Sequence, residues 1–260
     1  MIYSTYSASA DIQMRLKDGF MKKISKSSEL LWLLGDIFIA IGVAICSKAN
    51  LGVSMIAAPA FVVREALSSL WSGVTVGVVE YALQGVLLIL LCLLIRRFNW
   101  RFLLAFAVAI LYGYTLDLVL WIMTPISFDA VWLRWVMLLV GDVITALGVA
   151  CFFRTYMPLQ VYELFVAETA DRFHIALPKV KWLFDLSLLG VSIILAVLLF
   201  GDVTSFDWKT IGYSSFHSIG LGTLITTLIN SPIIAVMGKL LDRVFDPTPR
   251  FKGLERVLKR

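Results

Sequence analysis

Long apolar runs separated by short polar connections dominate the chain from residue 29 onward. A transmembrane helix needs roughly 20 apolar residues to cross about 30 Å of hydrocarbon, and six of the runs meet this length. They are Glu29–Ser47, Val74–Ile95, Phe102–Met123, Val131–Phe153, Val180–Phe200 and His217–Leu240. The pattern therefore predicts an all-α polytopic membrane protein with six transmembrane helices.

Two further apolar runs are too short to cross a bilayer. The first, Leu51–Val63, ends at a charged pair, and the second, Met157–Val166, ends shortly before Glu168. Pro59 interrupts the first run and Pro158 the second. Apolar runs of about 10–14 residues are more often re-entrant or interfacial than spanning. We expect one short re-entrant or interfacial helix in each region, at about residues 50–70 and 156–172.

The composition agrees with a membrane protein. Of the 260 residues, 60% are hydrophobic and 16% are charged, against about 45–50% and about 25% in soluble domains. The net charge of +5 is concentrated in two basic tails, residues 1–28 and 241–260, which suits anionic lipid better than nucleic acid. We expect as partners the lipid bilayer and a small solute or ion, no nucleic acid, and leave a homodimer open.

Basic residues predict the orientation. The N-terminal tail, the "RRFNWR" loop at residues 96–101 and the C-terminal tail are all rich in Lys and Arg. The positive-inside rule places such segments in the cytoplasm. Six spans put all three there, whereas a seventh crossing at Leu51–Leu70 would move the loop outside. No apolar signal-peptide region with a cleavage site precedes the first span, so we expect that span to remain as an anchor.

The sequence contains an internal repeat. "GDIFIAIGVA" at Gly35–Ala44 returns as "GDVITALGVA" at Gly141–Ala150, and "NLGVSM" from Asn50 corresponds to "YMPLQV" from Tyr156. A third match pairs "VEYALQGVLLILLCLLI" from Val79 with "FDLSLLGVSIILAVLLF" from Phe184. We expect two copies of one unit, residues 29–126 and 127–240, each a span, a short segment and two spans. Because three crossings is an odd number, the second copy must be inverted, an arrangement characteristic of secondary transporters.

Five carboxyl groups fall within the predicted spans: Asp36, Glu80, Asp117, Asp142 and Asp185. A charged residue at the bilayer centre costs about 2.5–3.5 kcal/mol or more, so all five should face the interior of the bundle. One interpretation is structural, in which a carboxylate caps a helix or pairs with a cation. The other is a binding site for protons or cations. Asp117 and Asp142 lie deepest, and for them both interpretations stay open. The other three lie nearer the span ends, where a structural role is favoured.

Further candidate binding residues lie near the ends and breaks of the runs. Lys48 and Arg154 follow the first and fourth spans, where they either anchor at the interface or meet an anionic group at a cavity mouth. "GLGT", which includes Thr223, and "NSP", which begins at Asn230, are expected to break the last span and expose backbone groups to a solute or ion. Pro59 and Pro158 complete the set.

Several strings resemble one known group, the YczE/YyaS/YitT-type bacterial integral membrane proteins, and most closely its YczE-like branch. They are "KANLGVSMIAAP" at Lys48–Pro59, "YGYTLD" at Tyr112–Asp117, "KVKWLFDLSLLG" at Lys179–Gly190 and "GLGTLITTLINSP" at Gly220–Pro232. The resemblance implies a protein of the bacterial inner membrane with both termini cytoplasmic, and it implies no particular substrate. A glycine and an acid commonly follow the proline of the second short segment, whereas this chain has Leu159-Gln160-Val161. If that acid takes part in binding, this member handles a different solute.

These features favour a secondary transporter or permease for a small solute that is cationic, zwitterionic or proton-coupled. A passive channel and a non-transporting component that binds a lipid or a partner complex are the alternatives. An enzyme is disfavoured, because Leu33 and Leu139 replace the first glycine of the GxGD pattern of intramembrane aspartyl proteases. No nucleotide loop or zinc motif occurs. The three cysteines (Cys46, Cys92 and Cys151) lie in apolar runs, and we expect no cofactor and no metal.

Overall fold

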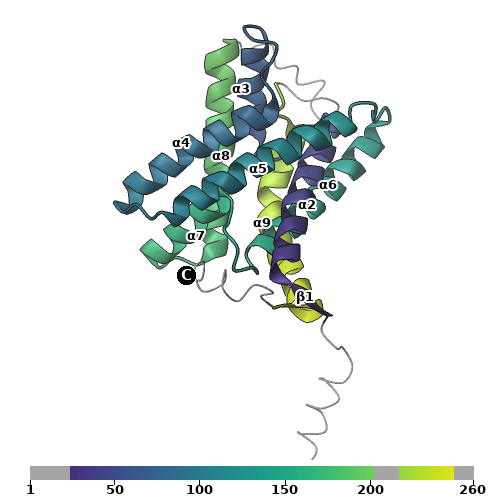
Figure 1. Ribbon diagram of the computed structural model, residues 1–260. Coiled ribbons are helices and arrows are strands. Elements are labelled where there is room, and N and C mark those ends of the chain that lie inside the picture. Colours follow the sequence, from purple (N-terminus) through teal and green to yellow (C-terminus); the bar gives the residue numbers. More distant parts are fainter. Residues whose placement is uncertain (1–23, 202–216, 249–260) are drawn as a thin grey trace, which may run out of the picture.

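The computed structural model describes residues 24–201 and 217–248, so the predicted tails lie largely outside the described residues. Six long helices dominate (Figure 1): α2 (Ser28–Ala49), α4 (Val76–Ile95), α5 (Arg101–Ile122), α6 (Val131–Phe152), α8 (Leu177–Phe200) and α9 (Leu221–Val244). Each is long and apolar enough to cross a membrane. The six predicted spans are confirmed, with ends that differ by a few residues.

Two short helices complete the predicted all-α architecture: α3 (Ala58–Ser68) and α7 (Val161–Phe173). Pro59 lies in the first turn of α3, where its missing N–H would have no helical acceptor. The stretch before α3, residues 51–57, is not helical, and every residue of it is buried. Non-helical backbone at membrane depth requires such protein cover. The short segments are therefore integral parts of the packed bundle.

Two four-residue strands, which the sequence did not predict, join the ends of the described chain. β1 (Ile24–Ser27) pairs in parallel with β2 (Phe245–Thr248). The pairing brings the start of α2 beside the end of α9. An even number of spans requires these two ends to lie on the same side of a membrane.

The most extensive helix contact of the described chain joins the two copies of the repeated string. A Cβ atom on Gly42 would lie 2.5 Å from the carbonyl oxygen of Gly141, and one on Gly141 would lie 2.8 Å from the carbonyl oxygen of Gly42. Gly35 and Gly148 form the same reciprocal pair, at 3.1 and 2.6 Å. Small residues permit such backbone approach between membrane helices. Since Gly35 meets Gly148 and Gly42 meets Gly141, α2 and α6 run antiparallel.

The helices that follow α2 and α6 have corresponding contacts. α4 packs on α5, and α8 packs on α9. α2 also contacts α5, as α6 contacts α9. Each short helix reaches across the molecule, because α3 packs on α8 and α7 packs on α4. The inverted relation of two whole repeats, residues 29–126 and 127–240, stays a prediction, with which the antiparallel crossing and these contacts agree.

The last span differs from its prediction. α9 is one continuous helix from Leu221 to Val244 with Pro232 inside it, so the expected break at "NSP" is wrong. Pro232 cannot donate to the carbonyl of Leu228, but one lost hydrogen bond is tolerated when neighbouring helices pack around the turn. α6 and α8 both pack on α9.

The surface and the interior have opposite character. Large apolar side chains are exposed along the outer faces of the spans, among them Ile89, Leu93, Trp121, Trp132 and Leu198. Buried positions include many polar groups, contributed by several helices. A fold with an apolar exterior and polar groups inside is suited to lipid rather than to water.

We predict that Gly42→Ala destabilises the protein by about 1–3 kcal/mol, the usual cost of overpacking. The new methyl group would lie 2.5 Å from a backbone carbonyl oxygen and 2.2 Å from Thr145 Oγ1. Gly190→Ala is the matched control, because a Cβ there has no heavy atom within 4 Å among the described residues. Thermal unfolding in detergent measures both. Equal melting temperatures would contradict the assigned crossing.

Candidate functional site

In residues 24–201 and 217–248, five carboxyl groups are buried inside the bundle, and each comes from a different helix. None is more than 2% exposed: Asp36 on α2, Glu80 on α4, Asp142 on α6, Glu163 on α7 and Asp185 on α8. Lys181 on α8 is the one buried cation in the described chain, at 3% exposure. We call these six residues the acid cluster. It contains four of the five carboxyl groups predicted from the spans, together with Glu163 and Lys181.

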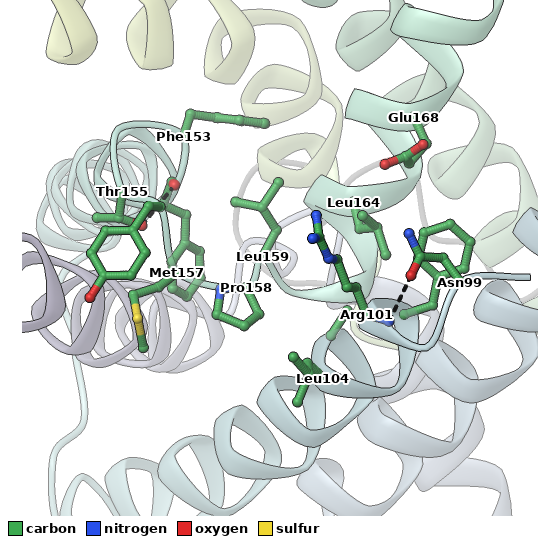
Figure 2. A pocket seen from close by; sticks show the side chains of 14 residues that line it. Asn99, Arg101, Leu104, Phe153, Thr155, Met157, Pro158, Leu159, Leu164 and Glu168 are labelled. Atoms are coloured by element: carbon green, nitrogen blue, oxygen red, sulfur yellow. Dashed lines mark hydrogen bonds between the residues drawn. The ribbon is translucent and has the colours of Figure 1, made fainter. Parts of the chain in front are cut away.

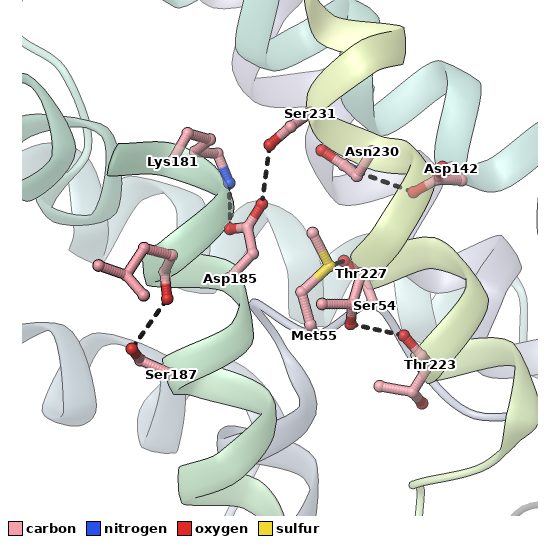
Figure 3. Close-up of polar contacts among 11 residues, drawn as sticks. Ser54, Met55, Asp142, Lys181, Asp185, Ser187, Thr223, Thr227, Asn230 and Ser231 are labelled. Carbon is pink, nitrogen blue, oxygen red and sulfur yellow. Dashed lines mark hydrogen bonds and ion pairs between the residues drawn. The ribbon is translucent and has the colours of Figure 1, made fainter. Parts of the chain in front are cut away.

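Lys181 and Asp185 form the ion pair of the acid cluster. They are four residues apart on α8, so they lie on the same helix face, and the Lys181 ammonium contacts Asp185 Oδ1. The hydroxyl of Ser231 on α9 donates to the other oxygen of Asp185 at 3.4 Å (Figure 3). Asp185 therefore has a charge partner and a second hydrogen bond.

Asp142 is held by α9. The amide of Asn230 donates to Asp142 Oδ1 at 2.8 Å (Figure 3). Asp142 Oδ2 and Asn230 Oδ1 are both buried and accept no hydrogen bond from the described residues. Lys181 and Asp185 are close enough to act on Asp142 electrostatically. Asp142, Asn230, Lys181 and Asp185 thus form a continuous polar region where α6, α8 and α9 meet.

Gln160 and Val161, where α7 begins, are hydrogen-bonded to α2 and α4. Gln160 donates from its side-chain amide to Asp36 Oδ1 at 3.3 Å. The backbone N–H of Val161 donates to Gln84 Oε1 of α4, also at 3.3 Å. Gln160 and Gln84 are fully buried. The connection from α6 to α7 is consequently fixed to α2 and α4 by polar side chains.

Glu80 and Glu163 contribute further buried carboxyl oxygens to the acid cluster. Both oxygens of Glu80 and Oε2 of Glu163 are buried without a hydrogen-bond partner in the described part of the chain. Burial raises the pKa of Glu163 to about 7, although nearby Lys181 opposes this shift, and Asp185 and Asp36 add to it. Tyr162 lies beside Glu80. Glu163 is thus poised to exchange a proton near neutral pH.

The acid cluster cannot hold five negative charges with one lysine. A buried carboxylate without a partner costs several kcal/mol, and the unpartnered oxygens belong to four of the five acids. Neutrality requires protons or a positively charged ligand. Binding and releasing such a charge is the chemistry that this arrangement supports.

Asp117 lies apart from this set. It is only half-buried, and its Oδ1 accepts the backbone N–H of Gly77 at 2.8 Å in the first turn of α4. An acid at a helix N-terminus satisfies a free N–H and complements the helix dipole. This geometry favours the structural interpretation for Asp117.

The remaining predicted residues lie at helix ends. Lys48 donates to the carbonyl of Thr124 at 3.2 Å, and Arg154 forms a bidentate ion pair with Asp242 of α9, at 2.6 and 2.8 Å. Thr223 is buried in the first turn of α9, where its hydroxyl accepts the N–H of Gly220. Pro59 lies in the first turn of α3, and Pro158 lies just before α7. Of the residues predicted beyond the five acids, Asn230 alone is seen hydrogen-bonded to the acid cluster in the described part of the chain.

A cavity of about 320 Å³ borders the connection that precedes α7 (Figure 2). Its walls are the start of α5, from Arg101 to Ala105, the connection from α6 to α7, from Thr155 to Leu159, and Leu164 and Glu168 of α7. Leu159 immediately precedes Gln160, the residue bonded to Asp36. We call this cavity the α5 pocket. It shares Asn99, Phe102 and Glu168 with a second hollow beside the α4–α5 loop.

Sequence reasoning missed Glu163, Lys181, Gln84 and Gln160. Two signals were available. Glu163 is an acid inside an apolar run, and Lys181 stands four residues before Asp185, the spacing of an ion pair on one helix face. The two glutamines gave no signal, since a lone amide in an apolar run predicts neither a site nor a partner.

A family model matches residues 26–239, which include every residue of the acid cluster. The chain belongs to DUF6198, a family of unknown function. No curated protein and no solved structure matches it.

We predict that Glu163→Gln weakens the pH dependence of stability. The folded pKa of about 7 exceeds the ordinary 4.5, so the folded protein holds this proton more tightly than the unfolded chain. That contribution is complete below about pH 4.5 and is lost as the pH rises through about 7. In detergent, the melting temperature of Glu163→Gln should therefore fall less between about pH 5 and about pH 8 than that of the wild type.

The control for this prediction is Glu168→Gln, on the same helix at the rim of the α5 pocket. It should retain the wild-type pH profile. A Glu163→Gln profile parallel to that of the wild type would contradict the assigned proton.

Proposed function

We propose that this protein is a secondary transporter for a small cationic or zwitterionic solute, with proton coupling, and that the acid cluster is its binding site. One observation carries the proposal: in the described part of the chain, five carboxyl groups from five helices are buried, together with one lysine. Intramembrane acids of this kind mark substrate paths and proton relays. An ammonium group and protons would compete for the same oxygens, which is a basis for exchange or coupled transport.

The fold supports a transport function. Secondary transporters commonly place their site near the bilayer midplane, between two inverted repeats. The antiparallel crossing of α2 and α6 and the matching contacts of the helices that follow them are what two inverted repeats would produce. Asp36 and Asp142 immediately follow the glycines Gly35 and Gly141 of that crossing. The proposed site therefore lies beside the interface of the proposed repeats.

We further propose a bacterial inner-membrane location with both termini cytoplasmic, and kinship with the YczE-like proteins. The basic "RRFNWR" loop and the pairing of β1 with β2 support the orientation. In this orientation the α5 pocket, which adjoins that loop, would open toward the cytoplasm.

Asp142→Asn should strongly reduce coupled uptake. Purified protein is screened by thermal shift against small amines and amino acids, and uptake of the most stabilising solute into vesicles is followed under a pH gradient. Asn cannot carry the charge or the exchangeable proton of Asp142, so the gradient-driven rate should fall by about tenfold or more, as expected for losing a hydrogen bond to a charged group.

Asp117→Asn is the matched control, because an asparagine oxygen can still accept the N–H of Gly77. It should keep uptake near the wild-type rate. Wild-type uptake in Asp142→Asn would refute the proposed site. Flux that ignores the pH gradient would indicate a passive channel, and solute binding without any flux would indicate a non-transporting component.

A further inference from the structure

We propose that the structure represents one of two alternating states of the protein, in which the acid cluster is approached through the α5 pocket and is sealed off at the equivalent position beside α9. This inference rests on the proposed transport function and adds the entrance and the gate. In a transporter built from inverted repeats, equivalent parts of the two repeats adopt different conformations, and exchanging those conformations moves access from one side to the other.

Two equivalent junctions can be compared. After α2, residues 50–55 ("NLGVSM") approach the start of α9. After α6, residues 156–161 ("YMPLQV"), the matching string, approach the start of α5. We call them the α9 junction and the α5 junction. Leu51 in the first corresponds to Met157 in the second. α9 and α5 are the fourth elements of the two halves, so the junctions would be alike in a symmetric molecule.

The α9 junction is closed by backbone contact. The N–H of Gly222 donates to the carbonyl of Leu51 at 2.8 Å, and the N–H of Val53 donates to the carbonyl of Ser218 at 2.9 Å. A Cβ on Gly220 would lie 2.2 Å from the carbonyl oxygen of Leu51. These distances leave no passage between the two backbones.

Further contacts hold the same junction. Gly52 has a φ of +109°, a conformation that favours glycine, and a Cβ there would lie 2.3 Å from Thr223 Oγ1. The residue at the lead-in to α9, His217, contacts Glu65 of α3 at 2.7 Å. Gly52 and the contact between His217 and Glu65 thus allow the residues just before α9 to pack directly against the connection that follows α2.

The α5 junction is open. Met157, Pro158 and Leu159 line the cavity of about 320 Å³ together with residues at the start of α5, among them Arg101 and Leu104 (Figure 2). The carbonyl of Pro158 accepts a hydrogen bond from the indole N–H of Trp32 on α2, at 2.8 Å, rather than from α5. Pro158 occupies the place of Gly52. The two junctions therefore differ in the manner expected of a molecule caught on one side of an alternating cycle.

Among the described residues, a hydrogen bond from Gln160 to Asp36 joins the open junction to the acid cluster. Leu159 is the last residue of the connection that lines the pocket, and Gln160 beside it bonds Asp36. A hydrogen bond to a charged carboxylate is stronger than one to its neutral form. Neutralising Asp36, by a proton or by rearrangement around a bound cation, would loosen the connection and let it move toward α5. Occupancy of the cluster would thereby control the gate.

The test compares cysteine reactivity at the equivalent positions Leu51 and Met157. Single variants Leu51→Cys and Met157→Cys are made after replacing the three native cysteines by alanine, and reaction with a small maleimide is timed by mass spectrometry in lipid vesicles. Met157→Cys should react about tenfold faster or more, the ratio for a population strongly biased to one state. Ser54→Cys, a nearly isosteric change at another buried position of the α9 junction, replaces Leu51→Cys if that variant does not fold.

A second substitution should reverse the order. Gly220→Val crowds the carbonyl of Leu51 without backbone strain, because Gly220 has a φ of −155°. With it, Leu51→Cys should become reactive and Met157→Cys protected. Gly190→Val is the matched control and should change neither rate. Three outcomes would each overturn the alternating gate. They are equal reactivity of Leu51→Cys and Met157→Cys, a reversal of their order by Gly190→Val, and high reactivity at both positions in the Gly220→Val background.

The labelling needs no solute, so its failure can be separated from failure of the proposed function. Uptake that depends on Asp142, together with equal labelling, would overturn the gate assignment alone. The expected labelling together with wild-type uptake in Asp142→Asn would support the gate and refute the acid cluster as the transport site.

Discussion

An ionised carboxyl group is stable inside a membrane protein only where protein groups, protons or a bound cation replace the water it loses. Here that constraint acts on five carboxyl groups at once, and they come from α2, α4, α6, α7 and α8. Those helices must therefore share one interior, with their apolar faces turned outward. Lys181 compensates part of the charge, and the rest of the cluster depends on protons or a positively charged ligand.

The repeated "GD…G" string connects this constraint to the packing of the fold. Its glycines allow α2 and α6 to cross with their backbones in contact, and the aspartate beside the first glycine of each copy is buried. The same few residues consequently determine both the crossing of α2 with α6 and the positions of the two aspartates. A sequence that needs both a close antiparallel crossing and an interior acid on each helix has reason to contain the string twice.

The short helices explain how the interior could communicate with the surface. α7 carries Glu163 into the acid cluster, and the connection before it carries both Gln160, bonded to Asp36, and Leu159, which lines the α5 pocket. In the proposed gate, a change of charge in the cluster would therefore act on the same stretch of chain that borders the cavity. The stretch before α3, which has the matching string, is instead bonded to the start of α9 and the residues just before it.

The sequence by itself determined the six spans, the two short segments and the inward direction of the acids Asp36, Glu80, Asp142 and Asp185. These features depend on the length and polarity of single segments, because each segment's own residues decide whether it is stable in lipid. Only the tertiary structure decided that Asp117 caps α4, that α9 continues through Pro232, and that Lys181 and Glu163 join the acid cluster. Those facts depend on which helices are neighbours, because the partner that stabilises a polar group lies on another helix, far away in the chain.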